Sequence, residues 1–455
     1  SGNLSDEPQC KTREEARQRL LGIADWLLWN ERPVINRVDD SILRVEGNTV
    51  RVLRRARGLA PELLPLPEGF EDAPSVWAFG ASLKNTFCRI IEGHALLSPH
   101  IGDLQEARAI ADFENSLTLF EQLYPQPTTH VAVDLHVDYP CTRIGKEFAQ
   151  QHQLPVLHLQ HHHAHMAACL VEYMVPLATT PVLGIILDGL GMGPNGELWG
   201  GEILLGDYRS VERLGSLKPV ALLGGDRAMR EPWRNTLAQL LGVMDWESFL
   251  ANYGELELAD FLRKQPISTY QSMLHLQKNA PLASSTGRLF DAVAGAIGLC
   301  QKSVAFEGQA AMQSQGLAET ALKSDTDEVV YPFKIEEWSL NGLPCLNPFP
   351  MWQALLDDLK MGTSTAVIAL RFHRGLAQGL LEFVQHLQKT RKNCSSVKQV
   401  VLSGGVFQNE LLAQLLETQL QEQGLFVLRP AKIPCNDGGI SLGQAAIAAA
   451  RTLKP

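Results

Sequence analysis

The chain has 455 residues, of which 45% are hydrophobic and 20% charged, and its formal net charge is −10. These values are typical of a globular protein of two to four domains, and the acidic balance argues against nucleic acid as a partner. The apolar runs fall short of the roughly 18 residues that a membrane-spanning helix needs. The eight cysteines are scattered without a C-x-x-C pair, which favours a reducing compartment. We therefore expect a cytoplasmic protein that does not bind membranes.

The N-terminal part predicts one helix followed by two strands. Apolar residues recur at helical spacing from about Thr12 to Leu28. The runs SILRV and TVRVLRRA, at 41–45 and 49–56, are typical of short strands. The segment 58–74 holds several prolines and few large apolar groups, so we interpret it as a linker and domain boundary.

Beyond residue 75, strands alternate with helices. The expected elements are a strand–turn–strand at 76–93, a strand at 129–136, a helix from about Gln160 to Met174, a second strand–turn–strand at 182–206, a helix-rich section over about 227–322, and strand–turn–helix units at 397–420 and 426–451. This order predicts an α/β chain with two lobes and a cleft between them.

The strongest chemical signal is the run Gln160-His161-His162-His163-Ala164-His165. His161 and His165 are four residues apart, so they share one face of the predicted helix. Two imidazoles one turn apart can bind one metal ion. The alternative is a polar helix start with surface histidines, and four histidines in five positions favour the metal site.

Two aspartates are candidates for further metal ligands, because an open metal site often adds carboxylates. Asp188 follows an apolar strand and begins a glycine-rich turn, and Asp437 lies in Asn-Asp-Gly-Gly just before a helix. Each also has a plain structural interpretation, since Asp188 could simply start a turn and Asp437 could cap the helix.

Three glycine-rich turns, at 80–85, 189–196 and 403–409, resemble phosphate cradles, because glycines let backbone N–H groups approach an anion. Together the three turns predict a nucleotide site. Lys84, in the first turn, could contact a phosphate, and the alternative is a solvent-exposed lysine in a turn. Two mixed-charge clusters, one with Arg227 and Arg234 and one with Arg288 and Glu307, could also contact a ligand, but ion pairs at helix ends are the favoured interpretation of both. The candidate nucleotide contacts in the second and third turns are Gly189, Gly191, Gly404, Gly405 and Asn409.

Motifs spread over nearly the whole chain resemble those of one family. They include NRVDDSILRV, GASLKNTF, VAVDLHVDYPCTR, QHHHAHMAA, LDGLGMGPNGELWGGE, STGRLFDAVAG, LSGGVFQN and NDGGISLGQA. The set resembles the HypF family, the carbamoyltransferases of nickel–iron hydrogenase maturation.

The resemblance implies a domain organisation and a fold. Residues 1–57 are similar to the end of a YrdC-like domain that forms carbamoyl-adenylate, and Ser1, Asn3 and Ser5 match a motif of its nucleotide site. After the linker 58–74, residues 75–455 resemble an actin/sugar-kinase-like transfer domain with a helical insertion at about 227–322. Family members carry an acylphosphatase domain, a zinc-finger region and a complete YrdC-like domain ahead of this part. The implied fold class is α/β, two-lobed and actin-like, preceded by a YrdC-like remnant.

The resemblance also implies chemistry. His161, His165, Asp188 and Asp437 would hold a metal ion, iron or zinc or Mg²⁺, with Lys84, Arg227 and Arg234 assisting catalysis. Carbamoyl phosphate and ATP would give carbamoyl-adenylate, whose carbamoyl group passes to the C-terminal cysteine of the partner HypE as a precursor of the cyanide ligands. The alternatives are an enzyme that carbamoylates a hydroxyl of a small molecule, a tRNA-modifying transferase, and a nucleotide-binding scaffold without catalysis.

Overall fold

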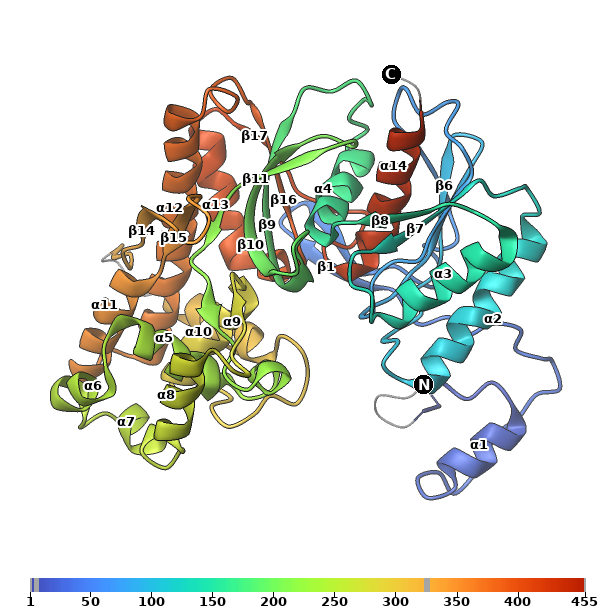
Figure 1. Cartoon of the computed structure of the whole chain (residues 1–455). Helices are drawn as coiled ribbons and strands as arrows, with labels where there is room; N and C mark the ends of the chain where they lie inside the picture. The colour runs from blue at the N-terminus through green and yellow to red at the C-terminus, as the bar shows by residue number, and fades with distance from the viewer. Residues whose placement is uncertain (1, 4–7, 323–327, 454–455) are drawn as a thin grey trace. The chain divides into compact units, whose positions relative to one another are not determined.

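The computed structural model describes residues 2–3, 8–322 and 328–453. They form two compact units, which Figure 1 shows coloured along the chain. Unit 1 comprises Ser1–Thr179 and Pro430–Pro455, and unit 2 comprises Thr180–Arg429. Both units contain a β-sheet with helices, as expected for an α/β chain.

Unit 1 is built on a six-stranded mixed sheet with the order β3-β6-β5-β4-β7-β8. The first four of these strands pair antiparallel, and β4, β7 and β8 run parallel. A two-stranded antiparallel ribbon, β1-β2, lies outside this sheet. The strands are β1 (Ile42–Glu46), β2 (Thr49–Arg54), β3 (Leu63–Pro65), β4 (Val76–Ala78), β5 (Cys88–Ile91), β6 (His94–Leu97), β7 (His130–Asp134) and β8 (Val156–Leu159).

Helices cover this sheet, with α2 and α3 on one side and α14 on the other (Figure 1). An aromatic core joins the sheet to α2 and α3, and Trp77, Phe87 and Phe113 are fully buried in it. Phe87 packs edge to face against Phe113 and Phe120, and such aromatic pairs help to hold these layers together. The helices of unit 1 are α1 (Arg13–Leu20), α2 (Ala107–Leu123), α3 (Pro140–His152), α4 (His161–Glu172), the short 3-10 helix η3 (Asp437–Gly439) and α14 (Ile440–Thr452).

Helices α4 and α14 pack unusually closely. A Cβ atom at Gly443 of α14 would collide with the carbonyl oxygen of Ala164 of α4, so only glycine allows this approach. Eleven residues of α4, from His161 to Val171, are buried. Because η3 leads directly into α14, this contact brings the Asn-Asp-Gly-Gly turn beside the histidine helix, although 270 residues lie between Met166 and Asp437 in the sequence.

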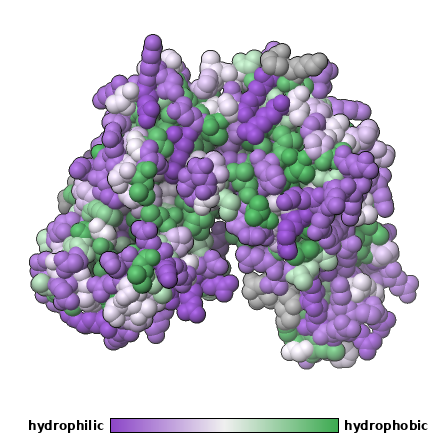
Figure 2. Space-filling view, viewed as in Figure 1, coloured by the Kyte–Doolittle hydropathy of each residue, from purple (hydrophilic) through white to green (hydrophobic). Residues whose placement is uncertain are grey.

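The N-terminal helix is shorter than predicted. The pattern extended it to Leu28, but α1 ends at Leu20. Trp26 and Leu28 are 92% and 103% exposed, so no burial of apolar side chains stabilises a helix there. The surface over this part of unit 1 mixes hydrophobic with hydrophilic residues (Figure 2). Both strands predicted after the helix are confirmed as β1 and β2.

Unit 2 contains a nine-stranded sheet whose main path is β14-β15-β11-β10-β9-β16-β17. Its centre is β9, an apolar strand that pairs antiparallel with β10 and parallel with β16. The strands are β9 (Val182–Met192), β10 (Leu198–Gly206), β11 (Val211–Leu217), β12 (Val220–Ala221), β13 (Leu282–Ala283), β14 (Lys334–Glu337), β15 (Pro344–Asn347), β16 (Gln399–Ser403) and β17 (Phe426–Leu428).

The helices of unit 2 pack mainly on one another and on this sheet. The longest, α12, contacts α10 and α13, and α5 packs against α9. Within the described residues, none of the helices has the length and apolarity that crossing a membrane requires. The helices are η1 (Gly225–Met229), α5 (Pro232–Val243), α6 (Trp246–Tyr253), α7 (Glu257–Leu262), α8 (Ile267–Leu276), α9 (Thr286–Ala296), α10 (Gln309–Leu322), α11 (Phe349–Lys360), α12 (Thr365–Thr390), η2 (Gly405–Gln408) and α13 (Glu410–Glu422).

Candidate metal centre

The histidine run begins helix α4, as its spacing predicted. The side chain of Gln160 caps the helix by accepting a hydrogen bond from the backbone N–H of His163 at 2.7 Å. The rings of His161 and His165 share one face, with centroids 5.0 Å apart. Both side chains are 1% exposed, which excludes the interpretation as surface histidines.

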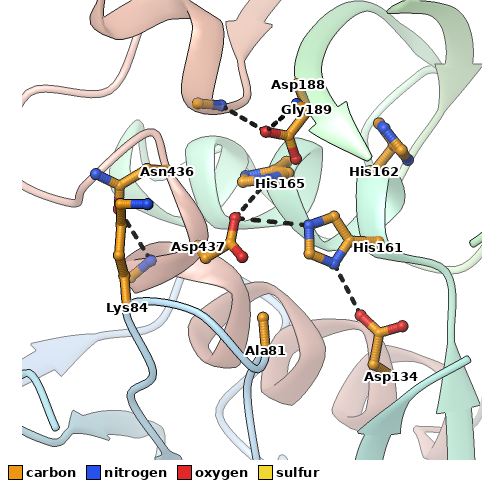
Figure 3. A network of polar contacts seen from close by, with 12 residues as sticks. Ala81, Lys84, Asp134, His161, His162, His165, Asp188, Gly189, Asn436 and Asp437 are labelled. Atoms are coloured by element: carbon orange, nitrogen blue, oxygen red, sulfur yellow. Dashed lines mark hydrogen bonds and ion pairs between the residues drawn. The ribbon is translucent and has the colours of Figure 1, made fainter. Parts of the chain in front are cut away.

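Asp437 faces these two rings from the turn before α14. Its Oδ1 atom lies 3.7 Å from Nε2 of His161 and 3.9 Å from Nε2 of His165, as Figure 3 shows. The side chain of Asn436 caps η3 by accepting from the N–H of Gly438 at 3.0 Å, which leaves the carboxylate of Asp437 to face the histidines. The turn therefore uses its asparagine as the cap.

These three donor groups fit a metal ion. Two donor atoms bound to one zinc or iron ion at about 2.0–2.2 Å each lie at most about 4.4 Å apart. The separations of 3.7 and 3.9 Å between carboxylate oxygen and imidazole nitrogen are within that limit. Two neutral imidazoles and a carboxylate are also a donor set that zinc and iron accept. His161, His165 and Asp437 would hold the ion within unit 1.

Asp134 supports His161 from behind, and the sequence patterns did not single it out. Its Oδ2 atom lies 2.8 Å from Nδ1 of His161, and the two side chains are 0% and 1% exposed. A carboxylate only accepts, so the Nδ1–H group of His161 donates and Nε2 carries the lone pair towards Asp437. This is the carboxylate–histidine arrangement that orients many metal ligands. The available signal was position, since Asp134 follows an apolar run as Asp188 does; in the structure Asp134 ends β7, whereas β9 continues past Asp188 to Met192.

A stacked pair of rings lies close to this centre. Tyr139 stacks on His136 with centroids 4.1 Å apart and planes 5° from parallel. Burial raises the pKa of the Tyr139 hydroxyl well above its usual value, while His161 nearby lowers it. The phenol therefore stays protonated at neutral pH, where its O–H can donate and its oxygen can accept a hydrogen bond.

Lys84 lies on the first glycine-rich turn, also in unit 1. Its backbone adopts a φ of 45°, and its N–H donates to Oδ1 of Asp103 at 2.8 Å. In Figure 3 the Lys84 side chain points towards Asn436, the neighbour of Asp437. The structure thus brings Lys84 to the same turn as one candidate ligand.

Asp188 belongs to unit 2, where it is 7% exposed. Its Oδ1 atom accepts hydrogen bonds from the N–H groups of Gly189 at 2.8 Å and Gly405 at 3.2 Å. These bonds tie the second glycine-rich turn to the third. The role of Asp188 as a further metal ligand stays a prediction.

The other predicted nucleotide contacts of unit 2 are also held by local packing. A Cβ atom at Gly404 would collide with the carbonyl of Leu187, so the turn after β16 needs glycine there. The carbonyl oxygen of Gly189 accepts from the hydroxyl of Ser285, and Gly191 pairs with Trp199 across the β9-β10 ladder. Their part in nucleotide binding stays a prediction.

Asn409 is engaged at both ends of its amide. Oδ1 accepts from the N–H of Leu412 at 3.0 Å and so caps α13, and Nδ2 donates to Nε2 of His373 at 2.9 Å. This side chain holds the turn after β16 to helix α12. A direct contact to nucleotide stays a prediction for Asn409.

The predicted catalytic arginines lie in unit 2. Arg227 is exposed in η1. Arg234 is buried, pairs with Glu231 at 2.7 Å, and lies over the rings of Trp233 and Tyr270. Arg288 pairs with Asp291 at 2.9 Å. The interpretation as helix-end ion pairs is confirmed for Arg234 and Arg288, and catalysis by Arg227 and Arg234 stays a prediction.

The candidate nucleotide contacts near the N-terminus are described only in part. Asn3 is half-buried in unit 1, whereas Ser1 and Ser5 lie outside the described residues.

Comparisons with known proteins match almost the whole chain. Residues 184–444 match the family described as "Carbamoyltransferase, Kae1-like Domain, second subdomain", and residues 71–172 match "HypF Kae1-like domain". Residues 1–56 match a family of Sua5, YciO and YrdC proteins described as "Telomere recombination". The predicted fold class, an actin-like domain preceded by a YrdC-like segment, is confirmed by these matches and by the structural likeness that follows.

Two curated relatives and one crystal structure extend the match. "Carbamoyltransferase HypF" of Rhodobacter capsulatus is 41% identical, over 99% of this chain and 57% of its own length. "Carbamoyltransferase HypF2" of Cupriavidus necator is 38% identical, over 99% of this chain and 56% of its own length. A crystal structure of full-length HypF in the phosphate- and nucleotide-bound form superposes with a TM-score of 0.86 at 35% identity, over 99% of this chain and 66% of that one. The chain thus spans little more than half the length of these two curated relatives.

Proposed function

The chain belongs to the HypF family of carbamoyltransferases, and we propose that it transfers the carbamoyl group of carbamoyl-adenylate to a cysteine thiolate of a partner protein. By the same proposal the acceptor is the C-terminal cysteine of HypE, and the carbamoyl-adenylate derives from carbamoyl phosphate and ATP. The product is a thiocarbamate that precedes the cyanide ligands of a hydrogenase. A full-length HypF that was crystallised in a phosphate- and nucleotide-bound form supports a nucleotide substrate.

The observation that carries this proposal is the cluster of His161, His165, Asp134 and Asp437 in unit 1, in which the first three side chains are buried and Asp437 is partly exposed. Asp437 faces both imidazoles of α4, and Asp134 fixes the tautomer of His161. Such an arrangement holds one cation with sides left open for a substrate oxygen. A bound ion would supply Lewis-acid polarisation of the carbamoyl oxygen or neutralise phosphate charge. Iron or zinc suits the donors, and Mg²⁺ is the alternative where phosphate oxygens complete the shell.

The transfer step balances without a redox partner. The thiolate sulfur attacks the carbamoyl carbon and forms a C–S bond. The bond from that carbon to the phosphate oxygen breaks, and AMP leaves with the electron pair. The developing negative charge on the phosphate needs a cation nearby, and the ammonium of Lys84 is the candidate on the turn that faces Asn436.

The glycine-rich turns of unit 2 would present the nucleotide. Gly189 has open space where a side chain would stand, Gly404 is packed against the backbone of Leu187, and the carboxylate of Asp188 holds the N–H of Gly405. Since this N–H is already used, we propose that nucleotide contacts come from the neighbouring backbone groups and from Gly191. Arg227 is exposed in the same unit and is available for a phosphate.

The experiment supplies carbamoyl-adenylate from a separate enzyme and measures the mass of HypE after incubation with this protein. A mass gain of one carbamoyl group at the terminal cysteine is expected with the wild type and is lost with His161→Ala. His158→Ala is the matched control, because His158 is an exposed histidine on the adjacent strand β8. Metal content of the three proteins is measured in parallel.

Two results would contradict the proposal. No mass gain with metal-loaded wild type would favour a small-molecule hydroxyl as the acceptor, or a nucleotide-binding scaffold without catalysis. A mass gain that persists in His161→Ala would separate the transfer from the histidine centre.

A further inference from the structure

Glu172 makes three hydrogen bonds that the proposed function does not use. Its Oε1 atom accepts from the backbone N–H groups of Ala431 at 2.7 Å and Lys432 at 2.9 Å. Its Oε2 atom accepts from the N–H of Ile433 at 2.9 Å. One carboxylate therefore binds three successive N–H groups of the segment 431–433, which leads to Asp437.

The position of Glu172 is not explained by helix stability. It is the last residue of α4, and a carboxylate at a helix C-terminus faces the negative end of the dipole, which is unfavourable. Bonds from N–H groups to a charged carboxylate are stronger than neutral ones and offset that cost. The favourable interaction is with the distant segment, 259 residues further along the chain.

The opposite side of the segment is bound to strand β2. The N–H of Val52 donates to the carbonyl oxygen of Ala431 at 2.7 Å, and the guanidinium of Arg51 donates to the carbonyl of Pro430 at 2.7 Å. Asn436 continues this pairing, since its Nδ2 donates to the carbonyl of Leu53 at 3.1 Å. The segment is thus clamped between the end of α4 and the edge of β2.

The clamp connects directly to the candidate ligand. Three residues lie between Ile433 and Asp437 in the sequence, and one of them, Asn436, both bonds to β2 and caps η3. The N-terminal end of α4 carries His161 and His165, while its C-terminal end holds the segment that presents Asp437. A single rigid helix therefore fixes the spacing between the imidazoles and the facing carboxylate.

We propose that Glu172 is a positioning residue, which sets the distance of Asp437 from His161 and His165 and thereby the affinity of the centre for its metal ion. This inference rests on the proposed function for the existence of the metal ion. Glu172 touches neither the ion nor the substrate. Its effect passes through three backbone N–H groups and the turn at Asn436.

The test uses Glu172→Gln, which keeps the length of the side chain. A glutamine amide offers one oxygen, so at least one of the three N–H groups loses its acceptor and meets an NH₂ group instead. Zinc affinity is measured by competition with a chelator on the full chain. The expected result is an apparent Kd about tenfold weaker than wild type, at the lower end of the range for residues that orient ligands. Glu147→Gln, an exposed glutamate on α3, is the matched control and is expected to bind zinc as the wild type does.

Two further readouts separate positioning from a merely structural role. Amide hydrogen exchange at Ile433 and Asp437 is expected to accelerate in the metal-free Glu172→Gln protein, while exchange in α2 stays unchanged. Saturating zinc is expected to restore carbamoyl transfer to the wild-type rate, because a displaced ligand is recovered by mass action. A protein that is simply misfolded would stay slow at every zinc concentration.

The outcomes distinguish this inference from the proposed function. A zinc Kd within twofold of wild type, with unchanged exchange at Ile433, would overturn the positioning role. If the wild type binds none of zinc, iron(II) and Mg²⁺, the metal centre fails, and the exchange rates at Ile433 and Asp437 still decide whether Glu172 holds the segment.

Discussion

Two buried histidines, one in each unit, show how the same side chain is put to different use. His161 begins α4 in unit 1, and His373 lies within α12 in unit 2, and they are 1% and 0% exposed. The Nδ1 atom of His161 is bonded to the carboxylate of Asp134 at 2.8 Å, and that of His373 to the carbonyl of Ala369 at 2.7 Å. The difference is at the other nitrogen.

Nε2 of His373 accepts a hydrogen bond from the amide of Asn409 at 2.9 Å. Both nitrogens of this ring therefore have neutral partners, and burial lowers the pKa of His373 to about 4. Nε2 of His161 instead faces a carboxylate oxygen at 3.7 Å, a separation that suits an ion between them better than a hydrogen bond. A carboxylate on each side marks a ligand, and neutral partners on both sides mark a structural histidine.

The largest effect expected from this comparison is the loss of metal binding in His161→Ala. Removal of one metal-binding side chain should weaken zinc binding more than about 100-fold. This exceeds the roughly 10- to 100-fold loss that is typical when a residue that only orients a ligand is removed. His373→Ala should leave the zinc Kd within twofold of wild type. Isothermal titration calorimetry measures the zinc Kd of both variants. Equal losses of zinc affinity in His161→Ala and His373→Ala would contradict the distinction between a ligand and a structural histidine.

Asp134→Asn should weaken zinc binding by about 10- to 100-fold, because the amide no longer holds the Nδ1–H tautomer of His161 by charge. The matched control is Asp138→Asn, an exposed aspartate four residues further along. Zinc competition assays on both variants decide the point. An unchanged Kd in Asp134→Asn would mean that Asp134 only fills space behind the ring.

His373→Leu should lower the free energy of unfolding by about 1–2 kcal/mol, because the buried amide of Asn409 loses its acceptor. Urea denaturation measures the loss, and the zinc Kd is expected to stay unchanged. A weakened zinc affinity in this variant would show that the two histidine environments are coupled.

The smallest effect concerns pH. The pKa of His373 in the folded protein, about 4, lies below its ordinary value of 6.5. The neutral ring therefore contributes fully to stability above pH 6.5, and this contribution is lost as the pH falls towards 4. Between pH 7 and pH 6 the wild type should lose about 0.7 kcal/mol more than His373→Gln in urea denaturation. An equal loss of unfolding free energy in the wild type and in His373→Gln would contradict the interpretation of His373 as a buried neutral histidine.

Much of the centre was predictable because its signals are local. The spacing of His161 and His165 fixes them on one face wherever the helix forms, and Asn-Asp-Gly-Gly before a helix specifies a tight, capped turn. The predicted strands and helices are present for the same reason, since apolar periodicity depends on residues close in sequence, whereas helices α2, α3, α11 and α12 were not predicted. The end of α1 was wrong because the apolar residues that extended the pattern, Trp26 and Leu28, are exposed in the fold.

The sequence by itself determined which side chains could serve as donors and which face of α4 carries them. Only the tertiary structure decided their partners. Asp134 meets His161 because β7 ends beside α4, and Asp437 meets both rings because Gly443 lets α14 approach Ala164. Asn409, expected at a nucleotide, caps α13 and holds His373. Backbone spacing is set within a few residues, whereas the partner of a buried polar atom is whichever group the packing of distant segments brings within reach.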